Sequence, residues 1–445
     1  SVSPWIHTLD SEPNYLKYRC HWTPPLAIDP FEDETVYYGC QVIFRTTDKG
    51  QNWTVISPDL SQPDKSHVVP SGGVVWDNLG QFYGQLVFAI APSPMQRGQL
   101  WAGTNDGKLW YTKNATAAKV DWTDVTANIK GLPPLATVSK IEPSSFDPAT
   151  AYVVFDNHIN GDRKPYLYKT TDLGATWTRL SDALPQAHPL DYLKSVAENP
   201  NKKGMLFAGS AHGFYYSMND GQTWTNFQGG LPRAPVTWIV YEKNYHDLVI
   251  STYGRGLWVM DDITRLEDTG QAAPAATETK LFTPRGLRQA RNGEVRITFS
   301  LVAAPAAAVQ FEVLDAANTV ARKFEVQAHA GLNVATWDMR YDAPGAVELR
   351  TTPPDNQRIA DRFPGRETRA VTHWGIQGAQ QYRPIGAPGK YTVRMMVGGQ
   401  TYTQTFNATK DGSLSATDAD LVESTRAQLR IRDALNATVN MTNGV

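Results

Sequence analysis

Residues 46–53 read TTDKGQNW, and the same stretch returns twice further along the chain. Residues 170–177 read TTDLGATW, and residues 217–224 read SMNDGQTW. Each copy has a hydroxyl residue, a carboxylate or amide two positions later, a glycine two positions after that, and a tryptophan three positions further on. Thr47 and Asp48 could be a nucleophile beside its base. Catalysis rarely needs three copies of one apparatus, whereas a repeat protein needs one structural unit in each copy, so the recurrence favours a structural role.

The residue types at these positions predict a tight turn. A short Asp or Asn side chain accepts hydrogen bonds from backbone N–H groups just ahead of it, and a Ser or Thr hydroxyl does the same more weakly. Glycine adopts a positive φ without a steric penalty, and the tryptophan offers a large apolar ring that can pack under the turn. We assign structural roles to three sets of residues: Thr46, Asp48, Gly50 and Trp53; Thr170, Asp172, Gly174 and Trp177; Ser217, Asn219, Gly221 and Trp224. A degraded fourth copy is expected at 112–122, with Thr112, Asn114 and Trp122.

This pattern resembles the Asp-box, or BNR repeat, of sialidases, sortilin-type receptors, xyloglucanases and a large set of bacterial secreted proteins. The resemblance is closest to the bacterial set, and it is carried by residues 36–60, 90–112, 165–177 and 251–263. It implies an Asp-box β-propeller. It implies no particular activity, because the Asp-box in those families is a structural turn remote from any active site.

Five units of similar pattern predict at least five propeller blades within residues 22–266. We place them at 22–60, 84–128, 135–182, 191–230 and 235–265, with an insertion at 61–84. Asp172 and Asn219 are 47 residues apart, in line with the roughly 40–50 residues of a propeller blade. Alternating apolar and polar residues favour strands over helices. Residues 1–21 resemble the tail of a preceding blade, and the family resemblance implies further N-terminal blades, so we expect a fragment of a larger ring.

The remainder of the chain predicts a second, smaller β domain. Residues 267–279 are rich in Pro and Ala and are expected to form a linker. Residues 280–410 alternate as an antiparallel sandwich does and resemble an immunoglobulin-like domain, interrupted by a long loop at 343–386. In the C-terminal segment, 411–445, Ser415 and Asp418 predict a capping box that opens a helix over 418–439. The predicted fold is thus all-β: a propeller, an immunoglobulin-like sandwich and a short C-terminal helix.

Charge and cysteine content exclude several classes of function. The formal net charge is −2 and no basic run is present, which argues against nucleic acid as a partner. No apolar stretch approaches the roughly 20 residues of a membrane span. Cys20 and Cys40 are too few for a zinc site but could form a disulfide in an oxidising compartment. We expect no metal and no cofactor, and a secreted, periplasmic or cell-surface location in a bacterium. Five sequons would then carry no glycan: Asn52, Asn114, Asn407, Asn436 and Asn440.

Candidate binding residues lie in the loops between the second and third strands of each unit and in the connections between units. Propeller topology brings these loops to one face, opposite the Asp-box turns, where loops normally carry function. The candidates are Asp106, Asp156, His158, Asp162, Arg163, His212, Tyr253 and Arg255, which Trp76, Asp77 and His188 could join. Each has an alternative as an ordinary polar loop residue, which is the commoner role for residues such as His158 and Asp162, and Arg255 could pair with Asp261 or Asp262. His158, His188 and His212 lack the tight spacing of a metal site.

Two functions are compatible with these residues. A sialidase needs an arginine clamp, and its Arg-Ile-Pro signature is absent here. A xyloglucanase-like enzyme needs two carboxylates roughly 6.5–9.5 Å apart, for which Asp106, Asp156 and Asp162 are available. The first hypothesis is a non-catalytic scaffold that binds a protein, peptide or glycan, with missing blades or another subunit as further partners. The alternative is a glycoside hydrolase acting at the channel mouth. An acidic pair with a raised pKa on one member would favour the alternative.

Overall fold

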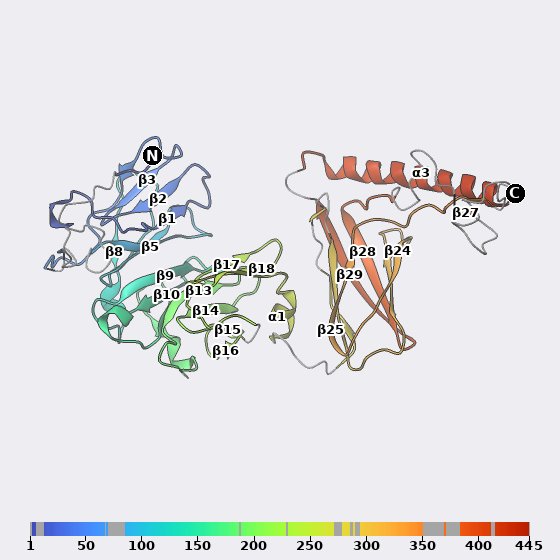
Figure 1. The fold of residues 1–445 in the computed structure, drawn as a ribbon. Coiled ribbons are helices and arrows are strands. Elements are labelled where there is room, and N and C mark those ends of the chain that lie inside the picture. Colours follow the sequence, from blue (N-terminus) through green and yellow to red (C-terminus); the bar gives the residue numbers. More distant parts are fainter. Residues whose placement is uncertain are drawn as a thin grey trace, which may run out of the picture. The chain divides into compact units, whose positions relative to one another are not determined.

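The computed structural model describes residues 2–5, 13–66, 68–69, 85–186, 188–227, 230–270, 278–284, 288–289, 294–349, 369–370, 383–410 and 414–444 (Figure 1). The chain divides into two compact units, Ser1–Ala272 and Ala273–Val445. In the described residues the regular structure is β apart from two α-helices and four short 3-10 helices, so the all-β prediction is confirmed. Within the part of the chain described, no helix has the length and apolar character needed to cross a membrane.

The first unit contains five antiparallel sheets in chain order, which we call blades 1 to 5. Blade 1 comprises β1 (Leu26–Ile28), β2 (Val36–Gly39), β3 (Ile43–Thr46) and β4 (Thr54–Val55). Blade 2 comprises β5 (Val87–Pro92), β6 (Leu100–Thr104), β7 (Leu109–Thr112) and β8 (Thr123–Asp124). Blade 3 comprises β9 (Thr137–Pro143), β10 (Ala151–Asp156), β11 (Tyr166–Thr170) and β12 (Thr178–Arg179). Blade 4 comprises β13 (Leu193–Glu198), β14 (Leu206–Ser210), β15 (Phe214–Ser217) and β16 (Thr225–Asn226).

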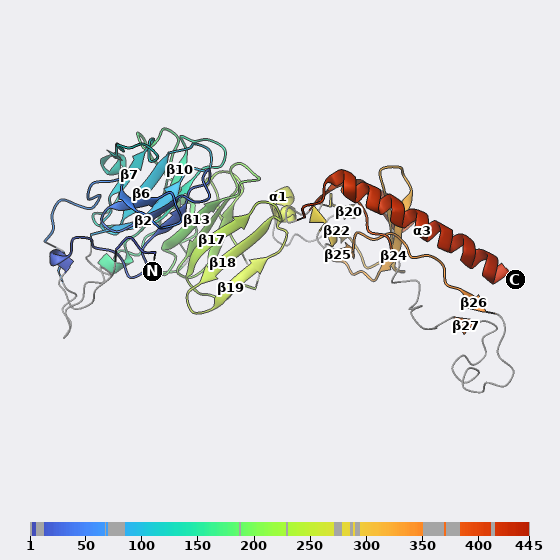
Figure 2. The same cartoon turned by 90° about the horizontal axis from the view of Figure 1, so that it is seen from above.

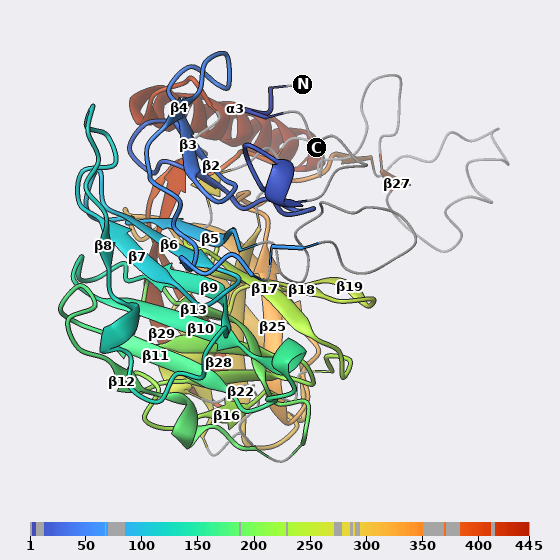
Figure 3. The same ribbon diagram turned by 90° about the vertical axis from the view of Figure 1, so that its left-hand side faces the viewer.

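Blade 5 has three strands, β17 (Val236–Glu242), β18 (Asp247–Thr252) and β19 (Gly256–Met260). In place of a fourth strand the chain enters helix α1 (Thr264–Thr269). The first strand of each blade contacts the first strand of the next, from β1 through β5, β9 and β13 to β17. Figure 3 shows the sheets following one another in this order. The first strands therefore lie innermost, as they do in a propeller.

The three repeated stretches form the same hydrogen-bonded turn, which we call the box turn. Thr170 Oγ1 donates to Asp172 Oδ1 at 2.8 Å and accepts from the Gly174 N–H, also at 2.8 Å. Asp172 Oδ1 in turn accepts from the Thr176 N–H at 2.9 Å. Equivalent bonds join Thr46, Asp48, Gly50 and Asn52, and Ser217, Asn219, Gly221 and Thr223. At Asp48, backbone and side-chain hydrogen bonds from Asn52, with that of Thr46, lower the carboxyl pKa to about 2.

The glycine of the box turn also packs closely against the preceding blade. A Cβ on Gly174 would lie 2.9 Å from Val125 Cγ1 in blade 2, and one on Gly221 would lie 2.8 Å from Leu180 Cδ1 in blade 3. Both glycines also have a positive φ. At the degraded copy, Trp122 Nε1 donates to the Ile56 carbonyl of blade 1 at 2.9 Å. The glycine is thus required both by the turn and by the approach of the neighbouring blade.

The disulfide Cys20–Cys40 ties the N-terminal segment to blade 1. Both cysteines are fully buried in a cluster with Val42 and Phe44, and Trp5 and Tyr18 pack against that cluster. The cluster covers part of the blade 1 face that points away from blade 2.

The second unit is a β-sandwich with one core. Its sheets are β20 (Lys280–Leu281), β22 (Val295–Leu301) and β25 (Gly331–Trp337), and β21 (Arg288–Gln289), β29 (Gln400–Lys410), β28 (Gly389–Val397), β23 (Val309–Leu314) and β24 (Val320–Val326). The core between the sheets includes Phe299, Phe311, Trp337 and Tyr391. The immunoglobulin-like assignment stays a prediction. Of the 343–386 loop the structure describes residues 343–349, 369–370 and 383–386. They include the paired strands β26 (Glu348–Leu349) and β27 (Arg369–Ala370).

Two sequence expectations need correction at element ends. Helix α3 (Asp418–Gly444) is capped by Thr417 and Asp420, not by Ser415 and Asp418, because the Thr417 hydroxyl accepts from the Asp420 N–H and Asp420 Oδ2 accepts from the Thr417 N–H. The expected 267–279 linker begins inside α1. Glu267 is buried there, and it accepts hydrogen bonds from Asn199 and Tyr241.

The Thr170→Val substitution tests the box turn. Valine keeps the shape of the side chain but removes the hydroxyl, so the buried Gly174 N–H loses its partner, and the free energy of unfolding should fall by about 1–3 kcal/mol. Urea unfolding measures this, with Thr178→Val on the exposed side of β12 as the control. Equal stability of the two variants would contradict a structural role for the turn.

Candidate functional site

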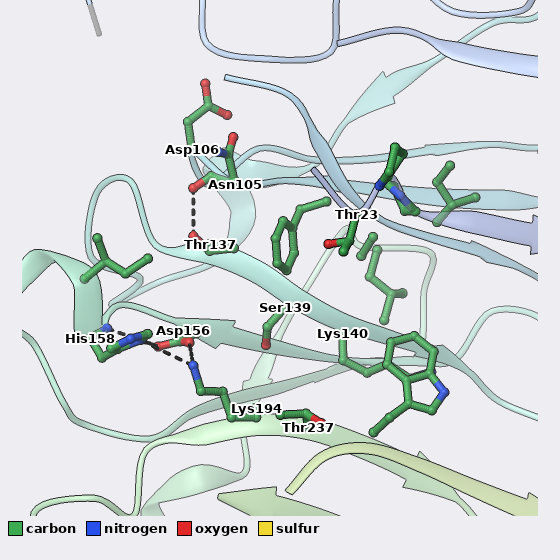
Figure 4. A pocket seen from close by; sticks show the side chains of 18 of the residues that line it. Thr23, Asn105, Asp106, Thr137, Ser139, Lys140, Asp156, His158, Lys194 and Thr237 are labelled. Carbon is green, nitrogen blue, oxygen red and sulfur yellow. Dashed lines mark hydrogen bonds and ion pairs between the residues drawn. The ribbon is translucent and has the colours of Figure 1, made fainter. Parts of the chain in front are cut away.

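A cavity of about 570 Å³ lies among the innermost strands of the first unit (Figure 4). Every blade contributes a side chain to its lining: Leu26 from blade 1, Phe88 from blade 2, Lys140 from blade 3, Lys194 from blade 4 and Trp238 from blade 5. A cavity of this size is typical of small-molecule sites.

A repeated backbone irregularity shapes this lining. In each of blades 2 to 5 the pairing between the first and second strands shifts by one residue at a single place, so one residue of the first strand has no partner in the second. These residues are, from blade 2 to blade 5, Phe88, Ser139, Lys194 and Thr237. All four line the cavity. A β-bulge re-aims a side chain, so the same distortion in four blades brings an aromatic ring, two hydroxyls and an ammonium group into one space. We call these four residues the bulge set.

Asp156, His158 and Lys194 form an ionic cluster on one wall of the cavity. Asp156 ends β10, and its carboxylate lies 2.6 Å from His158 Nδ1 and 2.6 Å from Lys194 Nζ. The imidazole of His158 stacks on the ring of Tyr192, with centroids 4.8 Å apart. Burial alone would raise the pKa of Asp156, but the hydrogen bond from His158 and the charge of Lys194 outweigh it and lower that pKa. Figure 4 shows the three side chains pointing toward one another.

Asp106 is held within the turn between β6 and β7. Its carboxylate accepts from the Thr104 hydroxyl at 2.5 Å and from the Gln62 N–H at 2.8 Å. Burial is the larger effect here, and it raises the pKa of Asp106. The cavity thus contains two carboxylates, Asp106 and Asp156, whose pKa values move in opposite directions. Such divergence is typical of acid and base pairs, although structural ion pairs also produce it.

The other predicted binding residues do not reach this cavity. Asp162 accepts from the Tyr166 hydroxyl at 2.5 Å, and Arg163 is exposed. Tyr253 and Arg255 are exposed in the turn between β18 and β19, and Tyr253 is 79% exposed. Trp76 and Asp77 lie outside the described residues. The structure therefore brings together Asp106, Asp156 and His158 and leaves the remaining candidates apart.

His212 lies in a separate cavity of about 240 Å³ between blades 4 and 5. Its ring stacks on His188 at 3.8 Å, and Arg233 Nη1 lies 2.9 Å from its Nε2. Burial, followed by the charges of His188 and Arg233, lowers the pKa of His212. His158 does not join this pair. In the residues that the structure describes, no three His, Cys, Asp or Glu side chains are grouped so that they could hold a metal ion.

The sequence offered a weak signal for the residues that loop position missed. The first strands of blades 2 and 3 both end in a proline, Pro92 and Pro143. Phe88 and Ser139 each stand four residues before that proline. Aligning the units on these prolines would have brought the two bulge positions into one column. Lys194 and Thr237 lack this marker, so only the observed register identifies them.

No protein-family model matches the sequence, and no curated protein matches it. Among solved structures, the chain is similar to an ancestral GH74 enzyme, with a TM-score of 0.41, 12% identity, and 90% of this chain and 48% of that chain covered. It is similar to the GH74 enzyme of Niastella koreensis, with a TM-score of 0.32, 14% identity, and 88% and 66% covered. A chain of the mitotic checkpoint complex gives a TM-score of 0.38 and 11% identity, with 74% and 85% covered. The chain spans about half the length of the ancestral enzyme.

The Lys194→Met substitution tests the ionic cluster. Removing the ammonium leaves a buried carboxylate with one partner fewer, which should lower the free energy of unfolding by about 3 kcal/mol at neutral pH. In the folded wild type the pKa of Asp156 lies below its ordinary value of 3.8. The ion pair with Lys194 therefore adds its full stabilisation to the free energy of unfolding above pH 3.8. This stabilisation is lost as the pH falls through the folded pKa. In the variant the ammonium of Lys194 no longer opposes the effect of burial, so burial raises the pKa of Asp156. The difference between the two proteins should therefore shrink as the pH falls from 7 toward 4.

Chemical unfolding across this pH range measures the effect, with the exposed Lys130→Met as the control. A difference independent of pH would show that Lys194 acts through packing alone.

Proposed function

We propose that the inner-strand cavity binds a glycan and that the protein is a non-catalytic binding scaffold. The observation that carries this proposal is the bulge set, which turns four different side chains into one cavity beside Trp238. The limited cavity volume favours one end of a glycan, or a similarly small polar ligand, over the broad surface of a protein.

The polar groups of the cavity suit a ligand that has many hydroxyls. Thr137 Oγ1 donates to the Asn105 carbonyl at 2.8 Å, and Ser139 Oγ donates to the Val154 carbonyl at 3.3 Å. Each hydroxyl therefore keeps lone pairs that can accept from a ligand. The ammonium of Lys194 has three N–H groups, of which Asp156 accepts one at 2.6 Å. A sugar ring, whose hydroxyls both donate and accept, matches this combination.

Trp238 supplies an apolar surface at the cavity. Its side chain is 50% exposed, and Lys140 Nζ lies 3.9 Å from the centroid of its ring. A rigid aromatic ring beside fixed polar groups buries apolar area at little cost in conformational entropy. The less polar face of a sugar can pack on such a ring while its hydroxyls reach Ser139 and Thr137.

We infer a secreted, periplasmic or cell-surface location. The disulfide Cys20–Cys40 supports this inference, because disulfides persist in oxidising compartments. The second unit would then serve to space or dock the binding unit.

Binding of soluble oligosaccharides tests the proposal directly. We expect Trp238→Ala and Ser139→Ala to weaken the affinity of the best glycan from a microarray, Trp238→Ala by at least about tenfold, which corresponds to about 1.4 kcal/mol. Calorimetric titration measures the affinity, and circular dichroism checks that the variants fold. Tyr253→Ala, exposed and outside the cavity, is the matched control. Unchanged affinity in Trp238→Ala would place the glycan elsewhere.

Glycoside hydrolysis at the same cavity is the second candidate. It is favoured by Asp106 and Asp156, which line one cavity and whose pKa values move apart. Asp106 would then be the acid and Asp156 the base. Against this role, both carboxylates already accept hydrogen bonds or ion pairs from neighbouring groups of the protein.

A panel of aryl glycosides separates the two functions. We expect the wild type to bind without releasing the aryl group. If it does release the group, Asp106→Asn or Asp156→Asn should abolish turnover while Asp162→Asn, outside the cavity, leaves it intact. That result would establish the enzyme and contradict the non-catalytic scaffold.

A further inference from the structure

A small cavity between blades 4 and 5 contains basic side chains that the proposed function does not use. Strand β17 of blade 5 lies beside β13 of blade 4 (Figure 2), and the cavity between these blades has a volume of about 240 Å³. Its lining includes the apolar side chains of Phe227 and Leu231 and the basic side chains of His212 and Arg233. Both blades belong to the first compact unit, and each contributes part of this lining.

Three separate segments bring basic side chains to this place. His188 precedes blade 4, His212 lies in the turn between β14 and β15, and Arg233 precedes β17. The Ser210 hydroxyl accepts from the His212 N–H at 3.1 Å, and Asp191 Oδ2 accepts from the His188 N–H at 2.8 Å. The rings of His188 and His212 stack, with centroids 3.8 Å apart and an angle of 6° between their planes. The two turns and the stack therefore hold the His212 ring in place.

The hydrogen bond between Arg233 and His212 determines where the protons lie. A guanidinium is always protonated and has only donors, so Arg233 Nη1 donates to His212 Nε2, 2.9 Å away. Nε2 therefore has no proton, and the imidazole of His212 is neutral. His188 Nδ1 likewise accepts, from the Leu190 N–H at 3.1 Å. In this state the cluster of His188, His212 and Arg233, which we call the basic cluster, has one positive charge, on Arg233.

The positive charge of Arg233 has no carboxylate partner in the part of the chain that the structure describes. Asp191 is the carboxylate that acts on His212, but it is buried. It already accepts from the His188 N–H and, at 2.9 Å, from the Tyr215 hydroxyl. Arg233 is exposed, and its remaining N–H groups can form charge-assisted hydrogen bonds. An anionic group of a ligand is the partner that this arrangement lacks.

The charges around His212 link its protonation to an anion. Burial, followed by the positive charges of His188 and Arg233, lowers the pKa of His212, and Asp191 opposes these effects in part. A carboxylate beside Arg233 offsets the positive charges and so raises this pKa. Once His212 is protonated, its Nε2 changes from an acceptor to a donor. It can then donate to the same carboxylate as Arg233.

We propose that this cavity binds a small organic monocarboxylate, whose carboxylate is held by Arg233 and His212 and whose apolar body packs on the lining beside them. The two oxygens of a carboxylate match the planar fork of an arginine. A dianion such as inorganic phosphate has no apolar body for this lining, and the basic cluster offers it only one permanent charge. This site is separate from the inner-strand cavity, so the proposal does not rest on the binding of a glycan there.

Benzoate and benzamide test this proposal, because they have nearly the same shape and differ in charge. In ligand-observed NMR titrations with the full chain, we expect benzoate to bind at least about tenfold more tightly than benzamide. Arg233→Ala should remove this preference, and Arg233→Lys should restore only part of it, because an ammonium lacks the planar fork. Lys243→Ala, which removes an exposed charge from the turn between β17 and β18, is the control and should keep the preference.

The pH dependence of benzoate binding tests the role of His212. The affinity should rise as the pH falls from about 7.5 to about 5, because protonation of His212 adds a second positive charge and a second donor. Bound benzoate should in return raise the pKa of His212, which the NMR resonances of the imidazole C–H groups report. In His212→Gln the pH dependence should disappear, while the preference for benzoate over benzamide remains.

Four results would overturn the proposal. They are equal affinities for benzoate and benzamide, tighter binding of inorganic phosphate than of benzoate, an effect of Lys243→Ala as large as that of Arg233→Ala, and a pH dependence that persists in His212→Gln. Absence of benzoate binding would overturn it as well. Circular dichroism checks that each variant folds.

Discussion

The hydrogen bond from the Gly174 N–H to the Thr170 hydroxyl, repeated at Gly50 and Gly221, is the interaction on which the arrangement of the blades depends. It fixes a glycine with positive φ at the tip of the turn, where a Cβ on Gly174 or Gly221 would collide with the preceding blade. Turn formation and blade packing are therefore coupled through one residue. A side chain at Gly174 would disturb the local turn and the junction with Val125 together, which explains why the glycine is present in all three complete copies.

The turns were predictable from the sequence because their chemistry is local. Eight residues contain every donor and acceptor of the box turn, so residue types at fixed spacing suffice to recognise it. The partner of the turn was not predictable, because Val125 and Leu180 belong to preceding blades and share only an apolar character. The positive φ of Lys49, Leu173 and Asp220 was also missed, since these side chains have nothing in common that favours it. The helix cap of α3 was assigned wrongly for a similar reason. Ser415 and Thr417 both fit the sequence pattern of a capping box, and only the observed hydrogen bonds identify Thr417 as the capping residue.

The candidate site was predictable in part. Loop position identified Asp106, Asp156 and His158, since topology brings the loops between second and third strands to one face. The same argument included Asp162 and Tyr253, because sequence does not give the distance of a loop residue from the innermost strands. It missed Lys194 and Ser139, which lie at bulges. A bulge depends on how two strands pair, and the sequence of either strand alone gives little indication of where the pairing shifts.

The box turns and the bulge set show opposite relations between geometry and chemistry. At the box turns the repeats keep both the backbone and the residue types, since any change removes a hydrogen bond or introduces a collision. At the bulges the backbone deviation recurs in four blades, yet its side chain is an aromatic ring in blade 2, a hydroxyl in blades 3 and 5, and an ammonium in blade 4. If a bulge side chain served only to stabilise its own blade, the recurrent distortion should favour one residue type, as the box turn does. The four side chains differ and all line one cavity, so the repeated bulge fixes where a side chain points and leaves its chemistry free to vary between blades.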